Sequence, residues 1–253
     1  MKFTFDREKM LAAFQPAASV APSRSPKPIL QCVKLIGTET SATLMATDTE
    51  VGIRVAVEGV TMEIPGNLVL PVDLFGNILR ESTDDQLTVA VDDKGISVKG
   101  GSSDYKLPSQ NADEFPDVQD VVGEARIEIA AGLFGELVKR TIFATDNESS
   151  RYALGGILLE TAGKNLIAVG TDGRRLAKME GPVEISGEIQ LGESSTIVPT
   201  RSMNLIARAL GDPDSIVQII PSDNQLAFKT DTVKLTSRLV EGRFPKWKDV
   251  FPK

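Results

Sequence analysis

One strand-and-turn pattern occurs twice in the chain. Residues 166–177 read LIAVGTDGRRLA and residues 44–51 read LMATDTEV, so each copy is a run of apolar and small residues followed by Thr-Asp. Such a run predicts a buried strand, and the Asp-Gly of the longer copy favours a tight turn because glycine accepts a positive φ. Either copy alone would indicate only an ordinary hairpin. Because Thr47 and Thr171 lie 124 positions apart, the two copies together indicate an internal repeat.

Two further landmarks recur at nearly the same distance. Pro71 and Pro199 are 128 positions apart, and the Phe-Pro pairs at 115–116 and 244–245 are 129 positions apart. These landmarks predict two domains of similar build, which suits a chain of 253 residues because one domain usually takes about 100–200 residues. The predicted domains are residues 1–122 and 123–253, with the boundary in the stretch VVGEA at 121–125.

Four segments repeat a shorter unit in which a strand leads directly into an amphipathic helix. The predicted strands cover residues 2–5, 67–70, 126–129 and 196–198. Apolar residues at helical spacing follow each strand: Met10, Leu11 and Phe14; Leu74, Phe75, Ile78 and Leu79; Leu133, Phe134, Leu137 and Val138; Met203, Ile206, Ala207 and Leu210. Turn signals and further strands come after each helix. The sequence therefore predicts an α+β fold in which each domain contains two strand–helix–strands halves.

The composition excludes several kinds of chemistry. Histidine is absent and Cys32 is the only cysteine, so Ser-His-Asp and Cys-His catalysis, a structural zinc site and an intrachain disulfide are ruled out. No G-x-x-x-x-G-K phosphate loop occurs. The sequence shows no signal peptide or membrane-length apolar segment. We expect a cytoplasmic protein without catalytic residues, cofactor or metal.

The net charge of −7 is unevenly distributed. Residues 1–122 carry 11 basic and 18 acidic side chains, whereas residues 123–253 carry 17 of each. Bulk attraction to nucleic acid is therefore not favoured. A helical wheel nevertheless places bases opposite the apolar stripe of every predicted helix: Lys9, Arg80, Lys139, Arg201 and Arg208. Exposed helix faces often carry lysine and arginine, so a purely structural role for these five residues stays open.

Motifs along the whole chain resemble those of the bacterial DNA sliding clamp family, the beta subunit of DNA polymerase III. In the first predicted domain these motifs are MKFTF at 1–5, PKPIL at 26–30, ATDTE at 46–50 and DEFPD at 113–117. In the second they are RYALGG at 151–156, VGTDGRRL at 169–176, IVP at 197–199 and LVEGRFP at 239–245. The resemblance implies a homodimeric ring of three such domains per chain, with helices on the concave side that faces DNA and sheets outside.

The same resemblance implies a role and a set of contacts with double-stranded DNA. A closed ring holds DNA by topology, so weak, sequence-independent phosphate contacts suffice and an acidic exterior is compatible with them. The implied DNA-contacting residues are Arg24, Lys9, Arg80, Lys139, Arg151, Tyr152, Arg201 and Arg208. The 253 residues stop where the family's second domain would finish. We therefore expect the third domain to be missing, and this chain alone not to close a ring.

Two further sites are implied by the resemblance. The first is a pocket for short motifs of partner proteins, namely the polymerase core, the clamp loader, other polymerases and repair proteins. It maps to Leu154, Thr171, Gly173, Arg174, Arg175, Leu176, Pro245 and Val250, and should be half-built without the third domain. The second is the seam of the ring, where Tyr105 and Leu107 match exposed apolar positions on an edge strand.

Two alternatives to a clamp remain. One is an enzyme that uses the acidic pairs Asp48/Glu50, Asp92/Asp93 or Asp212/Asp214, although their turn-like contexts favour solvated turns. The other is a β-rich scaffold that binds peptides but does not encircle DNA. Metal- or nucleotide-dependent turnover would favour the enzyme, and failure to hold DNA would favour the scaffold.

Overall fold

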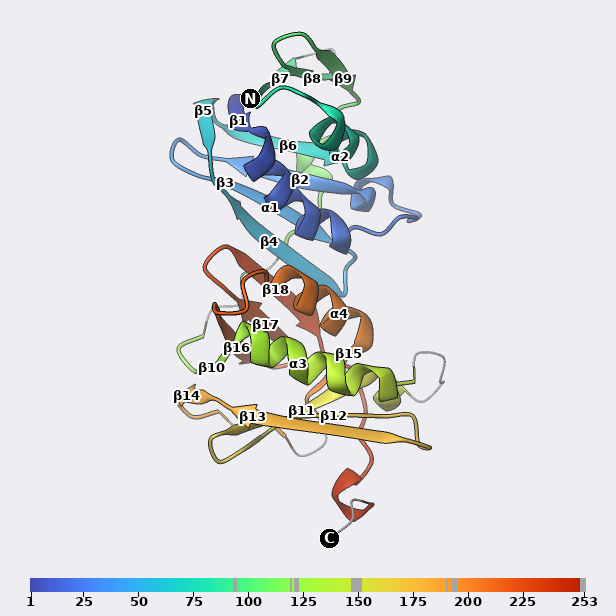
Figure 1. Ribbon diagram of the computed structural model, residues 1–253. Coiled ribbons are helices and arrows are strands. Elements are labelled where there is room, and N and C mark those ends of the chain that lie inside the picture. The colour runs from blue at the N-terminus through green and yellow to red at the C-terminus, as the bar shows by residue number, and fades with distance from the viewer. Residues whose placement is uncertain are drawn as a thin grey trace. The chain divides into compact units, whose positions relative to one another are not determined.

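The computed structural model describes residues 1–92, 95–118, 120, 123–146, 152–189, 191–192 and 195–250. Over these residues the chain forms four α-helices and antiparallel β-sheets (Figure 1), which confirms the predicted α+β class. The chain divides into two compact units, Met1–Gln119 and Asp120–Lys253.

Two antiparallel sheets form the first unit. One has the strand order β5-β1-β7-β8-β9 and the other has the order β6-β2-β3-β4. The strands are β1 (Lys2–Asp6), β2 (Cys32–Gly37), β3 (Ala42–Thr47), β4 (Val51–Val57), β5 (Val60–Ile64), β6 (Gly66–Pro71), β7 (Gln86–Asp92), β8 (Gly95–Lys99) and β9 (Asp104–Leu107). Short 3-10 turns lie at η1 (Pro28–Gln31) and η2 (Ala112–Glu114).

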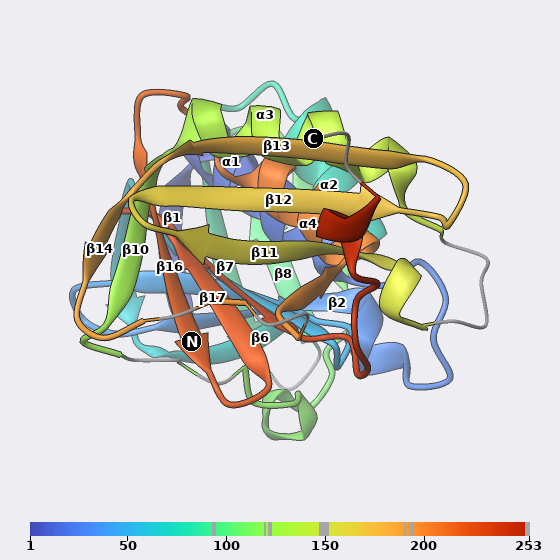
Figure 2. The ribbon, with the colours of Figure 1, turned by 90° about the horizontal axis from the view of Figure 1, so that it is seen from below.

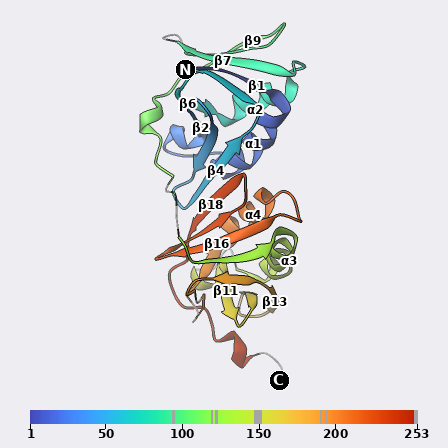
Figure 3. The ribbon, with the colours of Figure 1, turned by 90° about the vertical axis from the view of Figure 1, so that its left-hand side faces the viewer.

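The helices of the first unit are α1 (Arg7–Val20) and α2 (Val72–Glu81), which pack against each other on one side of the unit (Figures 1 and 3). The Asp6 side chain caps α1 by accepting a hydrogen bond from the Lys9 backbone N–H. Buried Phe14 and Phe75 join the helices edge to face, with ring centroids 5.2 Å apart. The prediction that Leu74 belongs to the buried stripe is wrong, since this side chain is 47% exposed.

The second unit also consists of two antiparallel sheets. Their strand orders are β14-β10-β16-β17-β18 and β13-β12-β11-β15, and Figure 2 shows β11, β12 and β13 side by side. The strands are β10 (Arg126–Ala130), β11 (Gly156–Ala162), β12 (Asn165–Thr171), β13 (Leu176–Pro182), β14 (Glu184–Ser186), β15 (Ile197–Pro199), β16 (Ile216–Ser222), β17 (Gln225–Lys229) and β18 (Val233–Arg238).

The helices of the second unit are α3 (Ala131–Thr141) and α4 (Thr200–Ala209). They contact each other, and α3 also packs on β12 and β13. Pro199 is the N-cap residue of α4, as Pro71 is of α2, and a proline at a helix start loses no intrahelical hydrogen bond. Short 3-10 turns lie at η3 (Ile142–Ala144), η4 (Tyr152–Leu154) and η5 (Trp247–Asp249).

The two units share one topology over the residues described. Each runs strand, helix, five strands, helix and three strands, and the strands take equivalent places in the sheets of both units. Within a unit the two halves exchange their first strands, because β1 pairs with β7 of the second half and β6 pairs with β2 of the first. The repeat seen in the sequence is therefore a repeat of structure.

Candidate functional site

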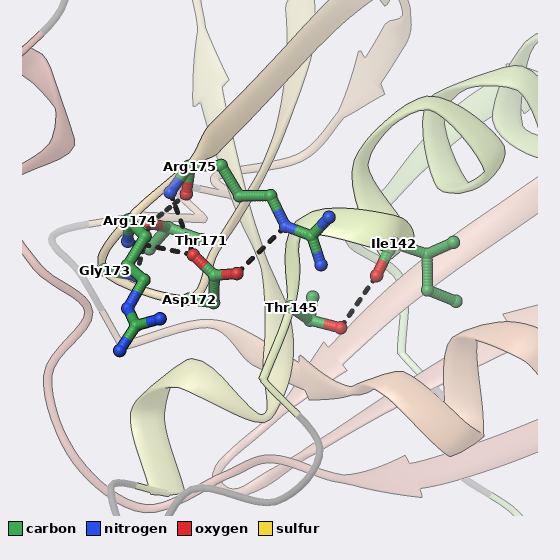
Figure 4. Close-up of polar contacts among 7 residues, drawn as sticks. All are labelled: Ile142, Thr145, Thr171, Asp172, Gly173, Arg174 and Arg175. Carbon is green, nitrogen blue, oxygen red and sulfur yellow. Dashed lines mark hydrogen bonds and ion pairs between the residues drawn. The ribbon is translucent and has the colours of Figure 1, made fainter.

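The turn between β12 and β13 is held by its own Thr-Asp pair (Figure 4). Thr171 Oγ1 donates a hydrogen bond to the Arg175 carbonyl at 2.7 Å and accepts one from the Gly173 N–H at 3.1 Å. Asp172 Oδ1 accepts from the N–H groups of Arg174 and Arg175, each at 2.9 Å. Gly173 has φ of 85°, a conformation that glycine adopts without strain. The turn therefore presents two successive arginines from a rigid base.

The equivalent turn of the first unit has the same hydrogen bonds. Thr47 Oγ1 donates to the Val51 carbonyl at 2.8 Å, and Asp48 Oδ1 accepts from the N–H groups of Glu50 and Val51. Thr49 takes the place of Gly173 and has φ of 82°, which is strained for a β-branched residue. The carboxylate of Asp48 thus serves the turn, which is the role that the sequence favoured over a catalytic one.

A cleft of about 360 Å³ opens beside the turn of the second unit. Its walls come from two segments far apart in the sequence, the β12–β13 turn and the stretch that contains η5. The lining residues are Thr171, Gly173, Arg174, Arg175, Leu176, Pro245, Lys246, Trp247 and Val250. Seven of the eight residues predicted for a peptide pocket are among them. Their role in binding stays a prediction.

Leu154, the eighth predicted residue, does not line the cleft. Its side chain is only 6% exposed. Lys246 and Trp247 line the cleft but were not predicted from the sequence. Their only sequence signal was their position next to Pro245, with Trp247 the sole tryptophan of the chain.

One wall of the cleft is apolar. Trp247 is buried in a cluster with Leu158, Val169 and other core residues, and Leu176 packs against that cluster. Val250, in contrast, is highly exposed, with 72% of its surface accessible to solvent. The cleft thus combines a fixed aromatic wall with an uncovered aliphatic side chain, an arrangement suited to an apolar anchor from another molecule.

The charges around the cleft are mostly positive. Arg175 Nε pairs with Asp172 Oδ2 at 2.9 Å, and its guanidinium lies 5.8 Å from the centre of the Phe143 ring. In Figure 4 the Arg175 side chain extends from the turn toward η3. The backbone N–H groups of Arg175 and Arg174 hold the pKa of the Asp172 carboxyl below its ordinary value, and the Arg175 side chain adds to this effect.

Two lysine side chains lie close to the ring of Trp247 in the aromatic wall. The ammonium groups of Lys178 and Lys248 lie 5.6 and 5.3 Å from the Trp247 ring centroid. Lys248 Nζ also pairs with Glu160 Oε2 at 3.1 Å. This pair joins η5 to β11.

The second candidate site consists of the bases predicted on the outward faces of the helices. The side chains of all five, and of the loop residue Arg24, are exposed: Lys9 on α1, Arg80 on α2, Lys139 on α3, and Arg201 and Arg208 on α4. Local contacts hold some of them. Lys139 Nζ lies 3.7 Å from Glu136 Oε1, and Arg140 binds the same carboxylate at 2.8 Å. Arg151 and the side chain of Tyr152 lie outside the described residues.

The residues predicted for a ring seam lie on β9, the edge strand of its sheet. Tyr105 is partly exposed, but Leu107 is only 5% exposed. The expectation that both side chains are uncovered is therefore wrong for Leu107, which packs into the core of the first unit. As the last strand in the described sheet, β9 presents Tyr105 and an edge with no neighbouring strand of that sheet.

The described ranges contain no group of three or more Cys, Asp or Glu side chains that could hold a metal ion. Two of the acidic pairs that an enzyme could use remain to be placed. In the pair Asp212/Asp214, the Asp212 carboxylate accepts a hydrogen bond from the Asp214 N–H within a turn. In the pair Asp92/Asp93, Asp93 lies outside the described residues. None of the four described helices has the length and apolar character needed to cross a membrane.

Comparison with known proteins gives one consistent match. Residues 1–119 match a family model of the DNA polymerase III beta subunit, N-terminal domain, and residues 128–246 match that of its central domain. The chain is 33% identical over 256 residues to the beta sliding clamp of Pseudomonas putida, a match that covers 100% of this chain and 68% of the relative.

Solved structures agree. The DNA polymerase III subunit beta of Pseudomonas aeruginosa superposes with a TM-score of 0.93 at 31% identity, covering 100% of this chain and 68% of that one. The sliding clamp of Bacillus subtilis gives a TM-score of 0.94 over the same shares of the two chains, at 24% identity, which speaks for the fold alone.

Proposed function

The chain belongs to the DNA polymerase III beta subunit family, the beta sliding clamps, and on that premise we propose that it forms part of a ring that encircles duplex DNA and tethers replication proteins to it. Members of this family are non-catalytic processivity subunits of a polymerase. The two units correspond to the N-terminal and central domains of the family. In this proposal the complete ring is a homodimer that acts in the cytoplasm.

The cleft of the second unit is the observation that carries the tethering part of the proposal. Two segments separated by some seventy positions come together with seven of the residues that the family resemblance implied for a peptide pocket. An apolar wall of Leu176, Pro245 and Trp247 beside exposed Val250 suits the leucine or phenylalanine anchors of a short motif. The partners in this proposal are the polymerase core, the clamp loader, other polymerases and repair proteins.

The exposed bases of the helices support the DNA part. They occur on all four described helices, yet they are few, and Lys139 shares the carboxylate of Glu136 with Arg140. Weak contacts of this kind carry no sequence information and allow sliding, which suits a protein that is held on DNA by ring closure. The proposed contact set is Arg24, Lys9, Arg80, Lys139, Arg151, Tyr152, Arg201 and Arg208.

The seam of the proposed ring uses the β9 edge. Tyr105 supplies a partly exposed apolar surface there, and the free edge of the strand can pair with another chain. Buried Leu107 would contribute indirectly, by anchoring β9 to the core of the first unit.

A labelled peptide tests the tethering proposal. A fluorescent peptide with the family's Gln-Leu-x-Leu-Phe motif is titrated with the chain, and binding is followed by anisotropy. We expect Leu176→Ala and Pro245→Ala each to weaken binding by about 1–3 kcal/mol, as loss of a central anchor contact does. Ile216→Ala is the matched control, because Ile216 is an exposed apolar residue on β16 outside the cleft.

Affinity that neither cleft variant changes would contradict the proposal. Peptide binding without any DNA contact would favour the alternative, a β-rich peptide-binding scaffold that does not encircle DNA.

A further inference from the structure

The mouth of the cleft carries an imbalance of charge. Among the nine described residues that line it, Arg174, Arg175 and Lys246 are cationic and none is acidic. A guest that brought only apolar side chains would add no counterpart to these charges. The unequal local environments of the three cations show which of them a guest can use.

Arg175 is already engaged by the protein. Its Nε is 2.9 Å from Asp172 Oδ2, and its guanidinium lies over Phe143. Because the Asp172 carboxylate is itself fixed by two backbone N–H groups, a guest carboxylate would have to compete with a preorganised partner. Arg175 therefore contributes to the shape of the turn more than to the charge offered to a guest.

Arg174 and Lys246 are differently placed. Both side chains are exposed, and within the described part of the chain neither has an ion pair. One comes from the β12–β13 turn and the other from the segment before η5, so the two cations lie on the two walls of the cleft. Along the chain, the acidic residue nearest to Arg174 is Asp172, which pairs with Arg175, and the one nearest to Lys246 is Asp249. Glu160 is paired with Lys248.

We propose that Arg174 and Lys246 make this cleft selective for peptides that carry carboxylates next to their apolar anchor. The proposal rests on the proposed function, since it specifies which motifs the tethering site prefers. The apolar wall of Leu176, Pro245 and Trp247 requires an anchor, which favours an acidic peptide over a nucleic acid as the guest. Charge complementarity at an exposed rim contributes modestly to affinity and strongly to the choice among partners.

The test compares three labelled peptides that share the Gln-Leu-x-Leu-Phe anchors. Position x and the two residues after Phe are all Asp, all Asn or all Lys. We expect the Asp peptide to bind about three- to tenfold more tightly than the Asn peptide at low salt, and the Lys peptide to bind most weakly. At high salt the three affinities should converge, because exposed charges are screened.

Variants assign the effect to the two cations. Arg174→Glu combined with Lys246→Glu should reverse the order of the Asp and Lys peptides, whereas Arg174→Lys combined with Lys246→Arg should keep it. Lys164→Glu is the matched control, because Lys164 is exposed in the turn at the opposite end of β12. This variant should leave the order unchanged.

The outcomes separate the two proposals. If all three peptides bind equally, or if the order survives in the double Glu variant, charge selection is overturned while the tethering site stands. If none of the three binds, both proposals fall. A short single-stranded oligonucleotide should not displace the Asp peptide, and displacement would show that the cations serve phosphates instead.

Discussion

Lys248 and Glu160 form an ion pair in which Lys248 Nζ lies 3.1 Å from Glu160 Oε2. The two side chains are unequal, because that of Glu160 is 9% exposed and that of Lys248 is 67% exposed. The pair connects β11 to η5, and η5 contains the cleft residue Trp247.

Loss of the lysine should therefore cost more than loss of an ordinary surface charge. Lys248→Met leaves a nearly buried carboxylate without its partner, and we expect it to lower the free energy of unfolding by about 1–3 kcal/mol. Arg140→Met is the control, since the side chain of its partner Glu136 is 42% exposed and the expected loss is below about 0.5 kcal/mol. Urea unfolding followed by emission of Trp247, the only tryptophan, reports on the second unit. Equal losses in both variants would contradict this interpretation.

In the two equivalent turns, replacing glycine and introducing glycine should have opposite effects on stability. Gly173 has φ of 85° and an added Cβ would meet no atom within 4 Å, so Gly173→Ala is penalised by backbone strain alone, by about 1 kcal/mol. Thr49 has φ of 82° at the matching position, so Thr49→Gly should stabilise the first unit by a similar amount. Thermal unfolding of both variants measures the effects. A stabilising Gly173→Ala or a destabilising Thr49→Gly would refute the strain argument.

The Asp172 carboxyl should make the turn sensitive to acid. Hydrogen bonds from the Arg175 and Arg174 N–H groups lower its pKa in the folded state. Its contribution to stability is therefore complete above the unfolded-state pKa of about 3.9 and is lost as the pH falls through the folded-state pKa. Asp172→Asn keeps the accepting oxygen but cannot ionise. The stability difference between the native chain and this variant should be largest at pH 7 and should close below about pH 4, and a constant difference would count against the assignment.

Removal of helix bases should change how DNA binding depends on salt. If Lys139 and Arg208 contact phosphates, each replacement by Ala lowers the slope of log K against log salt by about 0.9. Lys229→Ala serves as control, because Lys229 is an exposed residue on β17 and not on a helix. Binding of the chain to a duplex at several salt concentrations gives the slopes. Identical slopes in all three variants would show that Lys139 and Arg208 do not contact DNA phosphates.

The sequence predicted the β12–β13 turn well because the chemistry of that turn is local. Thr171, Asp172 and Gly173 build it from their own hydrogen bonds and backbone freedom, without help from distant residues. The strand–helix junctions were predictable for the same reason, since Pro71 and Pro199 mark helix starts by their covalent structure.

Burial was harder to predict because it depends on tertiary packing. Leu74 has the spacing of a core residue but lies outside the core, whereas Leu107 on an edge strand packs into it. Trp247 joins the cleft only because η5 folds back onto the cluster around Leu158 and Val169, which no local pattern indicates. The resemblance to a family supplied what local patterns could not, namely that residues near 175 and 250 lie close together.

The emission of Trp247 tests the central claim, that this cleft receives the apolar motif of a partner protein. An unlabelled Gln-Leu-x-Leu-Phe peptide added to the chain should change this emission in a saturable way, because the sole tryptophan lines the cleft. Leu176→Ala should shift the same change to about tenfold higher peptide concentration, in line with the loss of one anchor contact. A peptide that binds while the emission of Trp247 stays constant would place the guest elsewhere and contradict the account.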